Sequence, residues 1–201
     1  MIKRLFDICF SFTALLMLFP VLVCVYIAVL ITMGGPVLFR QERPGLGGKS
    51  FFLYKFRTMT VPKEGEYAAE FDSVRTTPLG KMMRSLSLDE FPTFINVLTG
   101  DMSIVGPRPL LVRYLERYSP EQARRHDVKP GITGWAQVNG RNAISWEEKF
   151  KFDVWYVDNY SFILDMKILF LTVLKVIKRE GVNHGEELTM PEFMGSSKKD
   201  E

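Results

Sequence analysis

Two adjacent carboxylates, Asp89 and Glu90, stand at the predicted start of a helix in the stretch from Ser85 to Pro92. A carboxylate can attack phosphorus or help to hold a divalent cation, so the pair is a candidate for chemistry on a phosphate. A structural role is the alternative. Ser87 and Glu90 fit the Ser-x-x-Glu capping box, and acidic residues stabilise the first turn of any helix. An isolated Asp-Glu pair is more often such a cap, so the surrounding residues must decide between the two roles.

Lysine and arginine residues elsewhere in the chain could offset the charge of phosphate oxygens beside such a carboxylate. Arg108 stands between Pro107 and Pro109, whose rings restrict the backbone on both sides. This rigid mount suits two-pronged recognition of a phosphate by a guanidinium. Arg141 lies in the predicted turn 139–142, where a phosphate ligand and a solvated surface residue are equally consistent with the sequence.

Positive charge is concentrated in one part of the chain. From Arg40 to Lys63 there are six Lys and Arg residues against one acidic residue, Glu42. A basic stretch beside an apolar segment fits an anionic membrane surface or a phosphorylated ligand. The net charge of +3 over 201 residues is modest, and no nucleic-acid partner is predicted. The run Gly45–Gly48 lacks the Lys-Ser/Thr of a P-loop, so nucleotide binding by that route is disfavoured.

An uncharged apolar segment extends from Ile8 to Met33 and precedes the basic stretch. It is long enough to cross a hydrocarbon core of about 30 Å at about 1.5 Å per residue. Pro20 lies near its middle, where it removes a helical hydrogen bond and predicts a kink. Positive residues flank both ends, which gives a single crossing little orientation bias and suits a helix that enters and leaves one face. A simple span and a re-entrant helix both remain open on these residues.

The elements that must position the carboxylates and cations are mostly helical, with short strands. Strands are predicted at 37–39 and 51–54 around a turn at 44–48. Helices are predicted at 79–84, 111–118, 120–125, 145–160 and 164–178. A further helix is predicted at 91–98, with its start moved to about 87–89. Loops are predicted at 62–77, with a weak helical turn at 67–71, at 100–109, and at 129–142 with a short strand. The last helix is short for a span and is better interpreted as buried or lying in the membrane interface.

In their order and spacing these pieces resemble one family, the bacterial sugar transferases or monotopic phosphoglycosyl transferases. The resemblance extends from about Lys3 to Gly181 and is closest to the short catalytic-core form, such as the enzyme that initiates bacterial N-glycan assembly. The matching blocks are Gln41–Gly45, Tyr54–Met59, Arg84–Pro92, Asn96–Pro109, Lys129–Val138 and Asn139–Arg141, together with the helix that contains Asp153 and Tyr156. One position departs from the family, since Phe19 stands where members often carry Ser before the membrane proline.

The resemblance implies a reaction and a role for each candidate residue. A UDP-sugar would donate its phosphosugar to undecaprenyl phosphate with release of UMP, as the first membrane step in assembling a glycan. Asp89 would be the nucleophile, forming a covalent phosphosugar intermediate, and would also contact Mg²⁺. Glu90 would assist proton removal or position the metal. The implied phosphate-binding cations are Arg108, Lys55, Arg84, Arg141 and Arg43.

The expected architecture is α+β, with a membrane-embedded re-entrant N-terminal helix and a small catalytic domain with amphipathic interfacial helices. The anchor would comprise residues 1–35, the catalytic domain 36–186 and a loosely held tail 187–201. A cytoplasmic UDP-sugar places the catalytic domain on the cytoplasmic face of the bacterial inner membrane. The alternatives are a membrane-attached phosphatase of lipid diphosphates and a non-catalytic membrane-surface scaffold. The sequence identifies neither the sugar, nor the glycan pathway, nor the oligomeric state.

Overall fold

The computed structural model describes residues 1–62, 72–140, 144–178 and 192–195. The fold is α+β and mostly helical, as the sequence predicts. A long helix, α1 (Ile2–Met33), runs beneath a catalytic domain built on two small sheets. Within the described residues α1 is the one helix that is long and apolar enough to cross a membrane.

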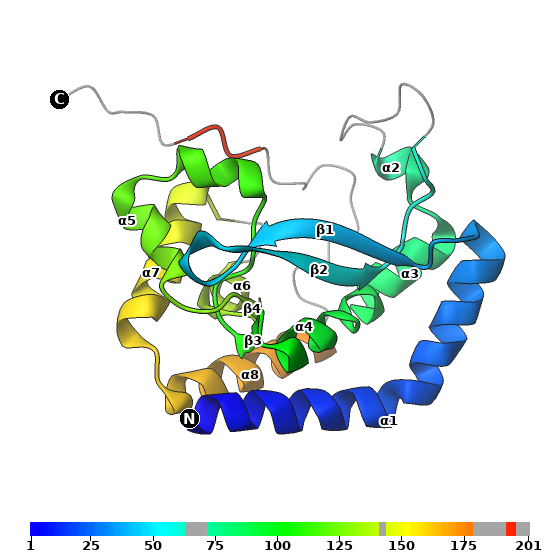
Figure 1. Ribbon diagram of the computed structural model, residues 1–201, viewed down its shortest axis with the longest axis horizontal. Helices are drawn as coiled ribbons and strands as arrows, with labels where there is room; N and C mark the ends of the chain where they lie inside the picture. Colours follow the sequence, from blue (N-terminus) through cyan, green and yellow to red (C-terminus); the bar gives the residue numbers. More distant parts are fainter. Residues whose placement is uncertain (63–71, 141–143, 179–191, 196–201) are drawn as a thin grey trace.

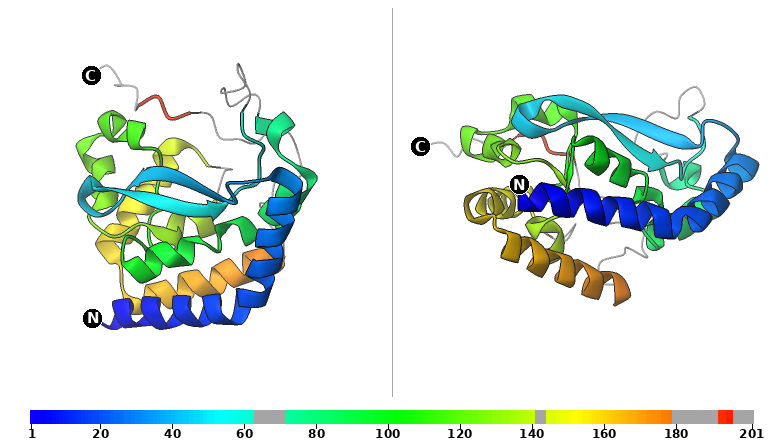
Figure 2. Two further views of the ribbon diagram at one scale, coloured as in Figure 1. Left: turned by 45° about the vertical axis from the view of Figure 1, so that its right-hand side comes forward. Right: turned by 60° about the horizontal axis from the view of Figure 1, so that its bottom comes forward.

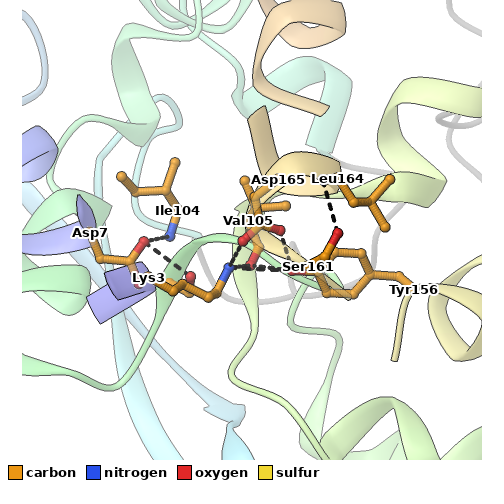
Figure 3. A network of polar contacts seen from close by, with 9 residues as sticks. Lys3, Asp7, Ile104, Val105, Tyr156, Ser161, Leu164 and Asp165 are labelled. Carbon is orange, nitrogen blue, oxygen red and sulfur yellow. Dashed lines mark hydrogen bonds and ion pairs between the residues drawn. The ribbon is translucent and has the colours of Figure 1, made fainter. Parts of the chain in front are cut away.

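Helix α1 begins and ends against the same domain. Near its start, the Lys3 ammonium donates to Asp165 Oδ2 at 2.5 Å and to the Val105 carbonyl at 3.0 Å, and Asp7 accepts from the Ile104 N–H at 3.1 Å (Figure 3). At its end, the Arg57 guanidinium donates to the carbonyls of Met33 and Gly34.

Between these two attachments α1 contains Pro20, and its ribbon changes direction part-way along (Figures 1 and 2). A proline inside a helix is a common cause of such a bend. The middle of the helix is apolar and exposed, with Leu16 at 64% and Met17 at 75% exposure. Large apolar side chains in water would be costly, so this surface is suited to lipid.

The first sheet is an antiparallel hairpin of β1 (Leu38–Pro44) and β2 (Ser50–Phe56), joined by the 3₁₀ turn η1 (Leu46–Gly48). Helix α4 (Thr93–Thr99) lies against β2 through the side chain of Asn96. Its amide accepts from the Tyr54 N–H at 3.1 Å and donates to the Phe52 carbonyl at 2.7 Å, as a neighbouring strand would. Helix α4 is therefore fixed to β2 in a definite register.

The chain before α4 is broken into short pieces. They are α2 (Asp72–Arg75), α3 (Pro78–Ser85) and the 3₁₀ turn η3 (Leu88–Glu90). The helix predicted to start near 87–89 begins at Thr93 instead, after the 3₁₀ turn η3. Ser87 has a left-handed backbone with φ of 55° and separates α3 from η3. A non-glycine residue in this region costs about 1–3 kcal/mol and is held by its surroundings.

The second sheet pairs two three-residue parallel strands, β3 (Ser103–Val105) and β4 (Gly131–Thr133). Glycines bring the following loops into close approach. A Cβ on Gly131 would lie 2.1 Å from the Gly106 nitrogen, and one on Gly134 would lie 2.2 Å from the Gly106 oxygen. The short strand predicted within 129–142 corresponds to β4, whereas β3 falls in the loop predicted at 100–109, because a strand this short carries no periodic signal.

Helices and 3₁₀ turns complete the domain. They are η4 (Val112–Arg117), α5 (Pro120–Ala123), η5 (Arg124–His126), α6 (Trp135–Asn139), α7 (Trp146–Asn159) and α8 (Phe162–Ile177). The predictions of α7 and α8 are confirmed within a few residues. Helix α6 falls in a predicted loop, and the helix predicted at 111–118 is a 3₁₀ helix. The helical turn expected at 67–71 lies outside the described residues.

Helix α8 lies beside the first part of α1 (Figures 1 and 2), where the Phe6 and Phe162 rings meet edge to face. One face of α8 is buried through Asp165 and Ile168, whereas Ile163 and Phe170 are exposed. The apolar surface of α8 thus continues that of α1, which fits an interfacial helix.

Candidate active site

The predicted carboxylates lie on η3, between α3 and α4. Leu88, which immediately precedes them, packs with Val25 and Val29 of α1 in one apolar cluster. The attachment of α4 to β2 then brings η3 next to the end of β2, where Lys55 contacts Glu90. The nucleophile candidate Asp89 therefore directly follows a residue that packs against the apolar cluster shared by α1, α3 and β2.

Glu90 is held between two cations. Its Oε1 accepts from Lys55 Nζ at 2.6 Å and from an Arg108 nitrogen at 2.6 Å. Burial raises the pKa of Glu90, but Arg108 and Lys55 together outweigh it and hold the pKa well below the usual range of a glutamate. Such a carboxylate remains ionised and is a weak proton acceptor. Its geometry is that of a residue that positions Lys55 and Arg108.

The capping interpretation of the pair is wrong for η3. The side chain of Ser87 makes no capping hydrogen bond there, and its left-handed backbone differs from the extended backbone of an N-cap. Glu90 contacts cations and not the Ser87 N–H. The acidic pair consequently lies at a break between helices, stabilised by contacts with β2 and the Arg108 loop.

Asp89 is buried, with 9% of its surface exposed. Burial and the neighbouring Glu90 raise the pKa of this carboxyl, while Lys55 and Arg84 lower it to a smaller extent. A carboxylate with little solvation and a raised pKa is a stronger nucleophile than one in water. Arg84 lies on the same side, where its Nε donates to the Thr58 hydroxyl at 3.0 Å.

Three of these cations line an open cleft beside Glu90. Its polar wall is formed by Arg43, Lys55, Glu90, Thr93 and Arg108, and its apolar wall by Leu53, Met102, Pro109 and Ile132. Burial, and secondarily Arg108, lowers the pKa of Arg43 to about 10, so its guanidinium remains charged at neutral pH. The cleft is thus lined by three cations and one anion, which leaves a net positive charge for an anionic ligand.

Arg108 lies between two prolines that restrict its backbone, and hydrogen bonds to the backbone of this loop hold it in place. The Gly131 N–H donates to the Pro107 carbonyl at 3.0 Å, and Arg125 donates to the Arg108 carbonyl at 2.7 Å. Arg125 is itself buried in an ion pair with Asp153 at 2.8 Å. Sequence reasoning missed Arg125, because Arg124-Arg125-His126 has the pattern of a solvated surface.

The structure brings most of the predicted site residues together. Glu90, Lys55, Arg43 and Arg108 line the cleft. Asp89 is the chain neighbour of Glu90, and Lys55 and Arg84 influence its carboxyl. Arg141 lies outside the described residues, and its predicted role stays a prediction.

Comparison with known proteins identifies the family. A family model described as bacterial sugar transferase matches residues 1–179. The chain belongs to the bacterial sugar transferase family. The match includes α1 as well as the cleft, so the anchor and the catalytic domain both belong to the family pattern.

Individual relatives support this assignment. The uncharacterised sugar transferase EpsL of Bacillus subtilis is 54% identical over 195 residues, which is 97% of this chain and 96% of that protein. The UDP-glucose:undecaprenyl-phosphate glucose-1-phosphate transferase of Escherichia coli is 44% identical over 185 residues, 87% of this chain and 40% of that protein. The undecaprenyl-phosphate galactose phosphotransferase of Salmonella typhimurium is 37% identical over 197 residues, 90% of this chain and 41% of that protein. The chain spans about two fifths of the length of these last two relatives.

Proposed function

We propose that this protein transfers a phosphosugar from a UDP-sugar to undecaprenyl phosphate on the cytoplasmic face of the bacterial inner membrane. The supporting observation is the position of Asp89. It is a buried carboxylate, the neighbour of Glu90 in a cation-lined cleft, and it directly follows Leu88, which packs against an apolar cluster that includes Val25 and Val29 of the membrane anchor. A lipid phosphate and a soluble nucleotide could both reach this place.

In the first step, a carboxylate oxygen of Asp89 attacks the phosphorus that carries the sugar. The bond from that phosphorus to the bridging oxygen breaks, and UMP leaves with the bridging oxygen. In the second step, a phosphate oxygen of undecaprenyl phosphate attacks the same phosphorus, and the Asp89 carboxylate is released. The product is undecaprenyl diphosphate-sugar, with the sugar-phosphate bond retained.

The cations have the task of bringing together anions that repel one another. Arg108, Lys55 and Arg43 would contact the donor phosphates, and Arg84 would offset the charge near Asp89. Glu90 holds Lys55 and Arg108 apart from Asp89, so that neither forms a close ion pair with the nucleophile. A direct ion pair would lower the reactivity of the carboxylate that must attack.

Mg²⁺ is the expected cofactor. Among the described residues there is no group of three or more His, Cys, Asp or Glu side chains that could enclose a metal ion. Asp89 and Glu90 supply two adjacent carboxylates, and this donor set fits a cation that takes its remaining ligands from water and substrate phosphates, as Mg²⁺ does. Asp89 would hold the ion, which when bound withdraws charge from the phosphate oxygens.

The sugar itself is not assigned, because the relatives are named for glucose, galactose and N-acetylgalactosamine donors. The test therefore uses a panel of UDP-sugars, with undecaprenyl phosphate and Mg²⁺ in detergent, and measures UMP. We expect UMP release with at least one donor, a phosphosugar adduct in the intact mass of the protein with donor alone, and loss of both in Asp89→Asn.

The same assay separates the alternatives. UMP release that continues to completion without undecaprenyl phosphate would indicate a hydrolase that uses water. An Asp89→Asn variant with full activity would overturn the assignment of the nucleophile. A folded protein that is inert with every donor would favour a membrane-surface scaffold.

A further inference from the structure

The segment Glu192–Gly195 inserts an aromatic side chain into the catalytic domain. The sequence predicts a loosely held tail here, and this is wrong for these residues, because only 2% of the surface of Phe193 is exposed. Four rings from η4, α7 and the residue that follows η4 surround it, and we call them the aromatic cage. Their centroids lie at 5.7 Å (Tyr114), 5.9 Å (Tyr118), 5.6 Å (Trp146) and 4.9 Å (Phe150) from that of Phe193.

Polar contacts hold the same segment by its charge and its backbone. Glu192 accepts from Arg113 and from Arg117, each at 2.8 Å. Arg117 also donates to the Phe193 carbonyl at 2.5 Å, and the Tyr114 hydroxyl accepts from the Phe193 N–H at 3.3 Å. The ligand recognised here is therefore a peptide with an acidic residue followed by an aromatic one, and a free aromatic ring would satisfy only part of the site.

The aromatic cage contacts Arg125, the residue that holds the Arg108 loop in place. The Arg125 guanidinium lies 5.7 Å from the ring centroids of both Tyr118 and Phe150, and it donates to the Tyr118 hydroxyl at 3.3 Å. The same guanidinium donates to the Arg108 carbonyl at 2.7 Å. Phe193 thus contacts two rings, Tyr118 and Phe150, that also contact Arg125, the residue that fixes the Arg108 loop.

The segment differs from ordinary core in how it is attached. Residues 192–195 form neither helix nor strand, and Met194 beside Phe193 is 75% exposed. The Glu192 contacts are at the surface, with side-chain exposures of 39% for Glu192 and 57% for Arg113. One buried anchor in a pocket, with a charged contact at its rim, is the usual form of peptide recognition.

The geometry points to a peptide-binding site in the aromatic cage that Glu192–Phe193 of the same chain fills, and whose occupancy positions the Arg108 loop. This inference goes beyond the transfer reaction. Only its second part, the effect on the Arg108 loop, is measured through the proposed activity.

Binding is tested on the full chain without any activity measurement. The double variant Glu192→Ala/Phe193→Ala empties the cage. A fluorescein-labelled peptide with the sequence of residues 190–196 should bind this variant saturably by fluorescence anisotropy and raise its unfolding temperature. The unmutated chain and the Met194→Ala control should bind it at least about tenfold more weakly, because their own segment competes.

Two results would overturn the binding site. One is a folded double variant that does not bind the peptide, and the other is an unmutated chain that binds it equally well. If Phe193→Ala prevents folding, Arg113→Ala/Arg117→Ala keeps every ring of the cage and removes the ion pairs of Glu192 and the hydrogen bond from Arg117 to the Phe193 carbonyl. Amide hydrogen exchange at residues 192–195 should then be faster than in the unmutated chain, and unchanged exchange would contradict the proposal. Concentration-dependent dimers held by this segment would also contradict it, because the occupant would then come from a second copy.

The effect on Arg108 is tested by kinetics of UMP release. In Glu192→Ala/Phe193→Ala the KM for the UDP-sugar should rise about tenfold, since small displacements of a binding group have effects of this size. The added peptide should reverse the change, and Met194→Ala should have normal constants. A lower kcat at unchanged KM would indicate a loss of folded enzyme and would overturn the coupling. If no UDP-sugar is turned over at all, the proposed function fails while the anisotropy result still stands.

Discussion

Asp89 and Glu90 are neighbours in the chain, but their surroundings favour opposite protonation states. Burial and Glu90 raise the pKa of Asp89, whereas Arg108 and Lys55 lower that of Glu90. At neutral pH the charge of the Asp89 carboxylate therefore destabilises the folded state, whereas the charge of the Glu90 carboxylate stabilises it. This contrast is consistent with one residue that reacts and one that positions its partners, since reactive groups are often held in unfavourable surroundings.

The two neutral variants should accordingly change stability in opposite directions. At pH 7, Asp89→Asn should unfold at a higher temperature than the unmutated protein. Glu90→Gln should lose on the order of 2 kcal/mol, because two cations lose a charged hydrogen-bond partner. The measurement is thermal unfolding in detergent, followed by circular dichroism.

The pH dependence of this difference has a defined sign. The stabilisation by Glu90 is present above its unfolded pKa, near 4.5, and is lost as pH falls through the lower folded value. The difference in the free energy of unfolding between Glu90→Gln and the unmutated protein should therefore become smaller below about pH 4.5. Equal losses in the two variants at pH 7 would contradict the assigned surroundings.

Among the elements, the parallel pair β3–β4 is small but fixes the loop that carries Arg108. Its glycines allow the backbones to approach so closely that a single methyl group has no room. Gly131→Ala would place a Cβ 2.1 Å from the Gly106 nitrogen, so β4 and the loop after β3 must move apart.

We expect Gly131→Ala to lose about 3 kcal/mol of stability, typical of overpacking against a rigid neighbour, and to lower the rate of UMP release. Gly35→Ala is the matched control, since nothing lies within 4 Å of its Cβ. The two variants are compared by chemical denaturation and by initial rates. A Gly131→Ala protein with unchanged stability would show that this approach is looser than the backbone geometry indicates.

The elements also show what the sequence could and could not predict. The β1–β2 hairpin and helices α7 and α8 follow from alternation, turn residues and helical periodicity. The left-handed Ser87 and the β3–β4 pair depend on contacts with distant segments, which local patterns do not encode. The same holds for the Arg125–Asp153 ion pair behind Arg108 and for the burial of Phe193. Charge and motif spacing predicted the residues that line the cleft. The residues that hold them in place were found only in the structure.

On the scale of the whole molecule, the two ends of α1 are attached to one domain. Lys3 and Asp7 bind residues of β3 and α8, and Met33 accepts from Arg57 of the segment after β2. A straight crossing would separate these ends by the thickness of the membrane, about 30 Å. We therefore expect both ends to lie on the same face.

Cysteine labelling of intact cells tests this topology. Cys9 and Cys24 are first replaced by serine, and single cysteines are placed at Ile2 and Val61, which are 71% and 59% exposed. Both positions should be shielded from an impermeant maleimide and labelled after permeabilisation. Opposite accessibility of the two sites would establish a simple span. Pro20→Leu should increase labelling at position 2, because a continuous apolar helix favours crossing.

The attachment of Lys3 to Asp165 also determines the order in which the molecule can be completed. The two partners are 162 positions apart, so the ribosome releases the start of the anchor long before its partner exists. Throughout that interval Lys3 and Asp7 have charged side chains at the end of an apolar helix and no partners from β3 or α8. The start of α1, although it is synthesised before α8, consequently reaches its final position only after translation has passed α8.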